Sequence, residues 1–171
     1  MPMTSLPLIA PLILTLTALL LGLRPGLPVR AAARLGEIAA VLALGVALLA
    51  AAALIAAGPG DSPLIGAFGI GFSARLDVVS IVMLLLVAFI GWVVTRYSRT
   101  YLDGEAGQIG FTLWLLATLA AVLVLVQSGN TVQFVAAWIA TSACLHRLLL
   151  FYPGRIAARR AARKKFVTAR I

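Results

Sequence analysis

The chain is short of charged residues and of the side chains from which metal and nucleophilic sites are usually built. Only 11% of its 171 residues are charged, and it has five acidic residues, one histidine and one cysteine. A lone cysteine, Cys144, excludes an intrachain disulfide and a cysteine-based metal site. His146 has no second imidazole with which to bind zinc, and no glycine-rich phosphate-binding loop precedes a lysine. We therefore expect no cofactor or metal in this chain and no stand-alone catalysis.

Hydrophobic residues, in contrast, make up 63% of the chain, against about half of a typical soluble domain. They gather in five runs with few or no charges, each near the roughly 20 residues that a helix needs to cross a bilayer. The second run is rich in alanine, which lets helices pack closely in lipid. The sequence predicts an all-α, polytopic membrane helix bundle with five transmembrane helices, at residues 6–23, 37–57, 76–94, 110–126 and 131–152.

The basic residues alternate between the two sides of these runs. The loop after the first run contains Arg24, Arg30 and Arg34, the loop after the third contains Arg96 and Arg99, and further basic residues follow the fifth. Because basic segments stay on the cytoplasmic side, we expect an external N-terminus and a cytoplasmic C-terminal tail. The net charge of +9 then indicates anionic lipid headgroups as partners, and no nucleic acid.

The tail at 153–171 is expected to be a cytoplasmic, basic, amphipathic segment. Pro153 and Gly154 break the fifth helix, and basic residues then recur at helical spacing on one broad face, as in helices that lie against lipid headgroups. Residues 166–171 turn apolar again, which is typical of the first turn of an incomplete sixth helix.

The connector between the second and third runs is rich in glycine and proline. Gly66, Gly69 and Gly71 alternate with apolar residues, which favours a short β-hairpin. Arg75 and Asp77 flank the start of the third run, where we expect a local ion pair or a helix cap.

The fifth run carries polar and ionisable side chains at membrane depth. Such groups are costly in lipid and often mark an ion path. With about 100° of rotation per residue, Ile139, Ser142 and His146 fall on one stripe of the helix. An imidazole titrates near pH 6.5, which makes His146 a candidate for proton transfer. The alternative is that His146 hydrogen-bonds a neighbouring helix and that Arg147 snorkels to the headgroups.

The order and spacing of motif residues between positions 76 and 171 resemble those of the antiporter-like proton-translocating subunits of respiratory complex I and Mrp-type antiporters. The residues that carry this resemblance are Leu76, Asp77, Ser80, Met83, Tyr97, Tyr101, Gly104, Glu105, Gly107, Trp138, Phe151, Tyr152, Lys164, Phe166, Val167 and Arg170. The run from Ala140 to Leu149 and the basic tail resemble more closely the membrane subunit of two-component inorganic-carbon-accumulating complexes. The resemblance implies the N-terminal portion of a longer subunit.

Such a subunit is expected to conduct protons or cations across a bacterial plasma (inner) membrane. The resemblance implies that it drives uptake of CO2 or bicarbonate with a large peripheral cytoplasmic subunit that binds zinc, or with other membrane subunits. The alternatives are a fragment of an NADH-quinone oxidoreductase or Mrp-type antiporter subunit, and a membrane scaffold that transports nothing. The proton-path candidates are His146, Ser142, Arg147, Lys164, Lys165 and Arg170, and the structural motif residues are Asp77, Ser80, Gly104, Glu105 and Trp138.

Two departures from the family pattern bear on this hypothesis. In the complex I subunits the tryptophan of the fifth helix is followed by a glutamate of the proton path, whereas Trp138 is followed by Ile139. The family's Arg-x-Gly-Asp motif would begin at Arg170, and the chain ends at Ile171. The hypothesis is that His146, two helical turns from Ile139, takes part in proton transfer in place of the missing carboxylate.

Overall fold

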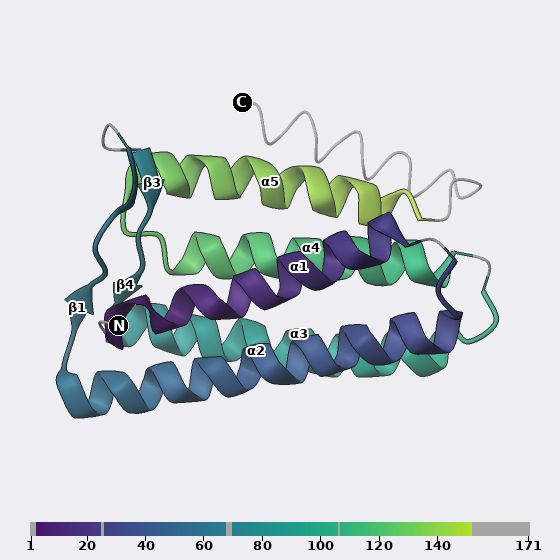
Figure 1. Cartoon of the computed structure of the whole chain (residues 1–171), viewed down its shortest axis with the longest axis horizontal. Coiled ribbons are helices and arrows are strands. Elements are labelled where there is room, and N and C mark those ends of the chain that lie inside the picture. Colours follow the sequence, from purple (N-terminus) through teal and green to yellow (C-terminus); the bar gives the residue numbers. More distant parts are fainter. Residues whose placement is uncertain (1–2, 25, 68–69, 106, 152–171) are drawn as a thin grey trace.

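Five long helices lie side by side in the computed structural model of the chain, which describes residues 3–24, 26–67, 70–105 and 107–151 (Figure 1). The short 3-10 helix η1 (Met3–Leu8) leads into the first of them. All five are long and apolar enough to cross a membrane when the first is counted from Ser5 in η1, which confirms the predicted multi-pass membrane bundle. They are α1 (Ile9–Leu23), α2 (Val29–Ala57), α3 (Val78–Tyr101), α4 (Gln108–Val126) and α5 (Thr131–Leu149).

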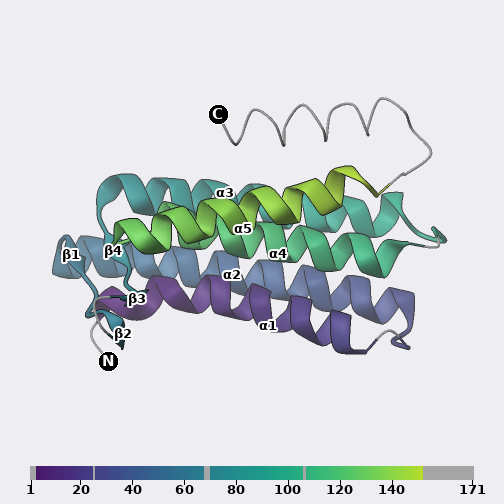
Figure 2. The same cartoon turned by 90° about the horizontal axis from the view of Figure 1, so that it is seen from above.

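Helices α1 to α4 form a four-helix group, and α5 is added to one side of it. Helix α2 packs against both α1 and α3, while α4 contacts α1, α2 and α3. Helix α5 packs along α4, on the side of the bundle away from α2 (Figures 1 and 2). Only 11% of the most apolar stretch of α5 is buried, against 28–33% in the other four helices. Most of the α5 surface is therefore open to lipid or to further protein.

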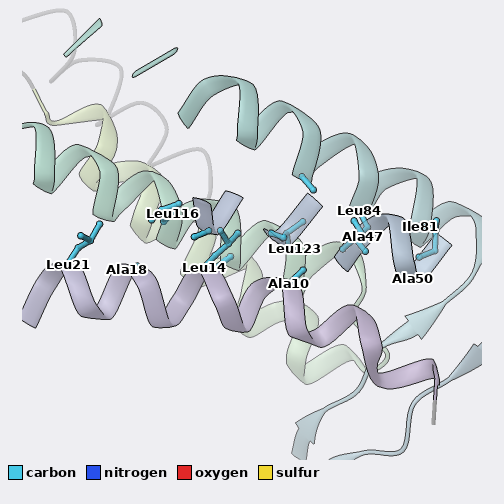
Figure 3. Packing of buried hydrophobic residues seen from close by; sticks show 14 of the residues in the cluster. Ala10, Leu14, Ala18, Leu21, Ala47, Ala50, Ile81, Leu84, Leu116 and Leu123 are labelled. Atoms are coloured by element: carbon cyan, nitrogen blue, oxygen red, sulfur yellow. The ribbon is translucent and has the colours of Figure 1, made fainter. Parts of the chain in front are cut away.

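Small side chains let the four-helix group pack closely. The buried face of α2 consists largely of alanines, such as Ala47 and Ala50, and the neighbouring helices meet it with leucines such as Leu14, Leu84 and Leu116 (Figure 3). Because lipid provides no hydrophobic driving force between helices, close contact of small residues is what holds such a core together. The close packing expected of the alanine-rich second run is confirmed.

The connections from α1 to α2 and from α3 to α4 are shorter than expected, and most of the arginines predicted to lie in them belong to the helices. Helix α2 begins at Val29, so Arg30 and Arg34 lie in its first two turns, and α3 continues to Tyr101, so that it includes Arg96 and Arg99. The prediction of basic loops at these positions is therefore wrong. Arginine is a good helix former, and a drop in hydropathy shows where a helix leaves the lipid and not where it ends.

The connector between α2 and α3 forms two pairs of short antiparallel strands. β2 (Ile65–Ala67) pairs with β3 (Ile70–Phe72), which confirms the predicted hairpin, and β1 (Gly60–Asp61) pairs with β4 (Arg75–Leu76). With η1 and the turn from α4 to α5, these strands make up one end of the bundle, the connector end (Figure 1). The opposite end, which holds the turns from α1 to α2 and from α3 to α4, is the arginine end.

Candidate functional site on helix α5

Helix α5 is anchored to the connector by hydrogen bonds at its first turn. Asn130 Oδ1 accepts from the Gln133 N–H at 2.7 Å, as N-cap residues do. Asn130 Nδ2 also donates to the carbonyl oxygen of Gly71 at 3.0 Å, and the Ser73 N–H donates to Gln133 Oε1 at 2.8 Å. These partners are 59 and 60 residues apart in the chain, so the sequence did not predict the anchor. The signal that the sequence does contain is two amide side chains, Asn130 in an uncharged turn and Gln133 directly after it.

The second half of α5 carries three of the residues predicted for a proton path. Ser142 and His146 are half-buried, and Ile139, at the start of their stripe, is 65% exposed. The guanidinium carbon of Arg147 lies 5.6 Å from the centre of the Trp114 ring on α4, within the range of a cation–π contact. Their role in proton transfer stays a prediction. The predicted amphipathic tail lies outside the described residues, and with it the remaining candidates, Lys164, Lys165 and Arg170.

The motif residues at the start of α3 form a helix cap. Asp77 Oδ1 accepts from the Ser80 N–H at 2.7 Å, and Asp77 Oδ2 lies 3.0 Å from Arg75 Nε. The backbone hydrogen bond from Ser80 lowers the pKa of Asp77 below its ordinary value of 3.8, and the charge of Arg75 acts in the same direction. Of the ion pair and the cap expected here, both are present.

The other motif residues shape a turn and an outer surface. Gly104 has a φ of +90°, a left-handed conformation that residues with a Cβ avoid. The Glu105 N–H donates to the carbonyl oxygen of Leu102 at 3.0 Å, and the Glu105 side chain is exposed. Trp138 is 54% exposed and its ring centre lies 6.3 Å from that of Phe134, also on α5. These three residues therefore have structural positions at the α3–α4 turn and on the open face of α5.

Ion pairs tie the helices together at the arginine end. Arg99 of α3 pairs with Glu37 of α2, and Arg30 Nε of α2 lies 4.0 Å from Asp103 Oδ1, just after α3. Arg147, near the end of α5, lies at the same end of the bundle (Figure 1). The arginines of the first and third connections, which the sequence assigned to one side of the membrane, thus lie at one end of the bundle.

The interior of the four-helix group is apolar between its two ends. The middle of the core is built of alanine and leucine, including Leu14, Ala43, Ala88 and Leu116. Buried polar side chains lie only near the ends in the part of the chain that the structure describes, at Thr95, Ser98, Gln108 and Thr112 toward the arginine end and at Ser62, Ser73, Ser80, Gln127 and Gln133 toward the connector end. Among the described residues, the middle of this interior is lined by apolar side chains.

A groove of about 800 Å³ separates α5 from α1, with α4 as its floor. Its lining is almost entirely apolar and rich in small side chains, among them Ala18, Gly22, Ala117 and Ala140. The groove therefore presents an apolar surface on the side of α5 that faces α1 and α4.

Comparison with known proteins shows which family this chain resembles. Residues 63–112 match the family model described as the N-terminus of chain 5 of NADH-ubiquinone oxidoreductase (complex I). This segment includes the cap residues Asp77 and Ser80 and the turn residues Gly104 and Glu105. The resemblance to the N-terminal part of the antiporter-like subunits, predicted from the sequence, is confirmed.

Individual relatives come from both branches that the sequence resembles. The probable inorganic carbon transporter subunit DabB of Hydrogenovibrio crunogenus is 44% identical over 94 residues, 54% of this chain and 18% of the relative. The corresponding DabB2 of Halothiobacillus neapolitanus is 38% identical over 135 residues, 75% of this chain and 24% of the relative. Subunit L of the NADH-quinone oxidoreductase of Escherichia coli is 32% identical over 107 residues, 63% of this chain and 18% of the relative. The chain thus spans about a fifth to a quarter of the length of these relatives.

Proposed function

We propose that this chain is the N-terminal helix bundle of a proton- or cation-conducting membrane subunit that drives the uptake of inorganic carbon. The two inorganic carbon transporter subunits are 44% and 38% identical to it, against 32% for the oxidoreductase subunit L of Escherichia coli, which supports carbon uptake over respiration. The chain acts as a transport subunit and not as an enzyme, and CO2 or bicarbonate is the transported carbon.

The subunit lies in a bacterial inner membrane with its arginine end in the cytoplasm. The arginines of α2 and α3 and Arg147 of α5 meet at this end, while the connector end has Arg75 balanced by Asp77. Because basic residues near span ends stay on the cytoplasmic side, the N-terminus is then external. A large peripheral zinc-binding subunit, or further membrane subunits, would dock on the cytoplasmic side, at the arginine end.

The observation that carries the proposal is the position of a titratable imidazole within a span on the most open helix. His146 and Ser142 lie on α5, which packs mainly on one neighbour, whereas the interior of α1 to α4 is apolar. An ionisable side chain within a span is a candidate for ion transfer by default. In this proposal α1 to α4 hold α5 in place, and the ion route follows the outer face of α5 against the rest of the transporter.

Two other functions compete with this one. The family match over residues 63–112 favours a complex I subunit, in which the same helix would serve a respiratory complex, and a related Mrp-type antiporter subunit would use it for cation exchange. A scaffold without transport of its own is favoured by the apolar core and by Ile139 at the position of the family's glutamate. The three proposals differ in what they require of His146 and in which process fails without it.

The proposal is tested by the variant His146→Gln, assayed in the complete transporter with its partner subunits present. Glutamine keeps hydrogen-bonding capacity but does not titrate, so we expect proton flux into vesicles and growth on limiting inorganic carbon to fall together. General acid–base groups contribute about 100-fold or more to proton transfer, so that a loss of this order is expected. The matched control is Thr141→Ala on the same helix, which removes a hydroxyl that donates to the carbonyl oxygen of Ala137 one turn back.

The outcomes separate the three functions. Loss of both flux and carbon-dependent growth in the His146 variant, with normal values in the Thr141 variant, supports the carbon transporter. Loss of flux with unchanged carbon-dependent growth favours the antiporter or respiratory subunit. Unchanged flux removes His146 from the path and favours the scaffold.

A further inference from the structure

A second polar feature lies at the arginine end, away from α5. It is a hollow of about 220 Å³ between α2, the end of α3 and the start of α4. The side chains that line it include three arginines, one carboxylate and one amide, namely Arg30, Arg34, Arg99, Asp103 and Gln108.

The charges around this hollow do not cancel. Arg99 is paired with Glu37, and Arg30 lies at the long distance of 4.0 Å from Asp103, with side chains that are 83% and 56% exposed. Arg34 forms no ion pair within the described part of the chain. Three guanidinium groups thus face two carboxylates, and the excess positive charge lies on Arg34, which is free to bind an anion.

Gln108 adds a second requirement for the ligand. This residue is only 3% exposed, and its Nε2 donates to the carbonyl oxygen of Arg99 at 3.1 Å. Its Oε1 is buried and accepts no hydrogen bond from any described residue. A buried polar atom without a partner is rare and costly, and an oxygen acceptor needs a donor. An ammonium donor would be repelled by the three arginines that line the hollow, whereas a neutral hydroxyl would not, so the complementary ligand carries a hydroxyl group beside its negative charge.

The surface next to the hollow indicates where such a ligand comes from. Ile38 and Leu42 follow Arg34 at intervals of four residues on α2, and they are 54% and 52% exposed. Residues at this spacing share one side of a helix. A charged hollow at the end of a membrane helix is therefore continued by an apolar strip, which matches the shape of a phospholipid with its headgroup in the hollow and its acyl chains along α2.

We propose that this hollow binds the headgroup of an anionic phospholipid that bears a hydroxyl, as phosphatidylglycerol does. The phosphate pairs with Arg34 and Arg30 by charge-assisted hydrogen bonds, and the glycerol hydroxyl donates to Gln108 Oε1. Bicarbonate and hydrogen phosphate share the same chemistry, an oxyanion with a hydroxyl donor, but they have no acyl chains to occupy the strip of Ile38 and Leu42.

Lipid binding to the purified full chain in neutral detergent tests this proposal, with native mass spectrometry as the readout. We expect phosphatidylglycerol to bind more tightly than phosphatidylcholine of the same acyl chains. Arg34→Gln is expected to weaken phosphatidylglycerol binding roughly tenfold, the effect of losing one charge-assisted hydrogen bond. Arg24→Gln, at the same end but outside the hollow, is the matched control and should leave binding unchanged. An equal loss in both variants would reduce the effect to general surface attraction and overturn the site.

Two further measurements fix the chemistry of the ligand. Phosphatidylmethanol has the same charge but no headgroup hydroxyl, so the wild type should bind it more weakly than phosphatidylglycerol. The Gln108→Met variant should bind the two lipids equally well. A preference that survives in Gln108→Met would remove Gln108 from the site, whereas the Arg34 comparison stands without this variant. Displacement of the lipid by millimolar bicarbonate or phosphate would assign the hollow to a free anion and overturn the lipid proposal.

Discussion

Gly36 lies where α2 meets α4, and its replacement by alanine is expected to push the two helices apart. A Cβ atom at this position would lie 2.7 Å from Thr112 Cγ2 and 3.6 Å from Leu116 Cδ1. Carbon atoms in good contact are about 3.5–4.0 Å apart, and overpacking of this kind costs about 1–3 kcal/mol. Alanine is favoured over glycine in a helix by about 1 kcal/mol. The net loss in the free energy of unfolding is therefore about 0–2 kcal/mol.

Gly45, two and a half turns further along the same helix, provides the matched control. A Cβ atom there would meet nothing within 4 Å, so Gly45→Ala keeps only the propensity gain of about 1 kcal/mol. Thermal unfolding of the full chain in one detergent should thus separate the two variants by about 1–3 kcal/mol. Thr112→Ser removes the Cγ2 methyl and should rescue Gly36→Ala. Equal melting of the Gly36 and Gly45 variants, or no rescue by serine, would refute the close approach of α2 and α4.

Two smaller predictions concern the motif residues. Asp77→Ala should cost about 1 kcal/mol of stability, because it removes the N-cap, whereas Asp77→Asn keeps the cap and loses only the charge. Folding lowers the pKa of Asp77, so the charge of this carboxylate stabilises the fold fully above pH 3.8, and the effect is lost as the pH falls below that value. In thermal unfolding, the advantage of the wild type over Asp77→Asn should therefore shrink at low pH. An advantage that grew at lower pH would contradict this. Gly104→Ala should cost about 1–2 kcal/mol because of its left-handed backbone, while Gly110→Ala, with nothing within 4 Å, should be tolerated; equal melting temperatures would show that the turn is not strained.

The spans of this fold could be predicted from the sequence because the bilayer imposes them. A helix must keep charges out of about 30 Å of hydrocarbon, so the uncharged runs mark the spans whatever their neighbours are. Helix ends are not under the same constraint. Arg34 and Arg99 continue their helices into the headgroup region, where arginine is equally compatible with helix and loop, and only a tertiary contact such as the Arg99–Glu37 pair shows which of the two is present.

The candidate site was predicted only in part. Its own residues are close together in the sequence, whereas the contacts that hold α5 in place come from residues far away in the sequence. His146, Ser142 and Arg147 lie within one turn or so of each other, so helical periodicity was enough to group them. The anchor of α5 depends on Ser73 and Gln133, 60 residues apart, and the cation–π contact of Arg147 depends on a tryptophan of another helix. No period in the sequence links such pairs, and they follow only from the order in which the helices pack.

Different forces hold the two ends and the middle of the bundle, and this determines how it responds to its surroundings. The connector end depends mainly on hydrogen bonds such as that from Ser73 to Gln133, beside one local ion pair between Arg75 and Asp77. The middle depends on close packing, and salt has little effect on hydrogen bonds and packing. The arginine end depends on ion pairs, one of them with side chains that are 83% and 56% exposed, which ions and lipid charges screen. A change in the surface charge of the membrane therefore acts on the arginine end. His146 and Arg147 lie in the last turn of α5, at the arginine end. A change in membrane charge therefore acts on this part of the helix, whereas the anchor at the first turn of α5 is held by hydrogen bonds that such a change affects little.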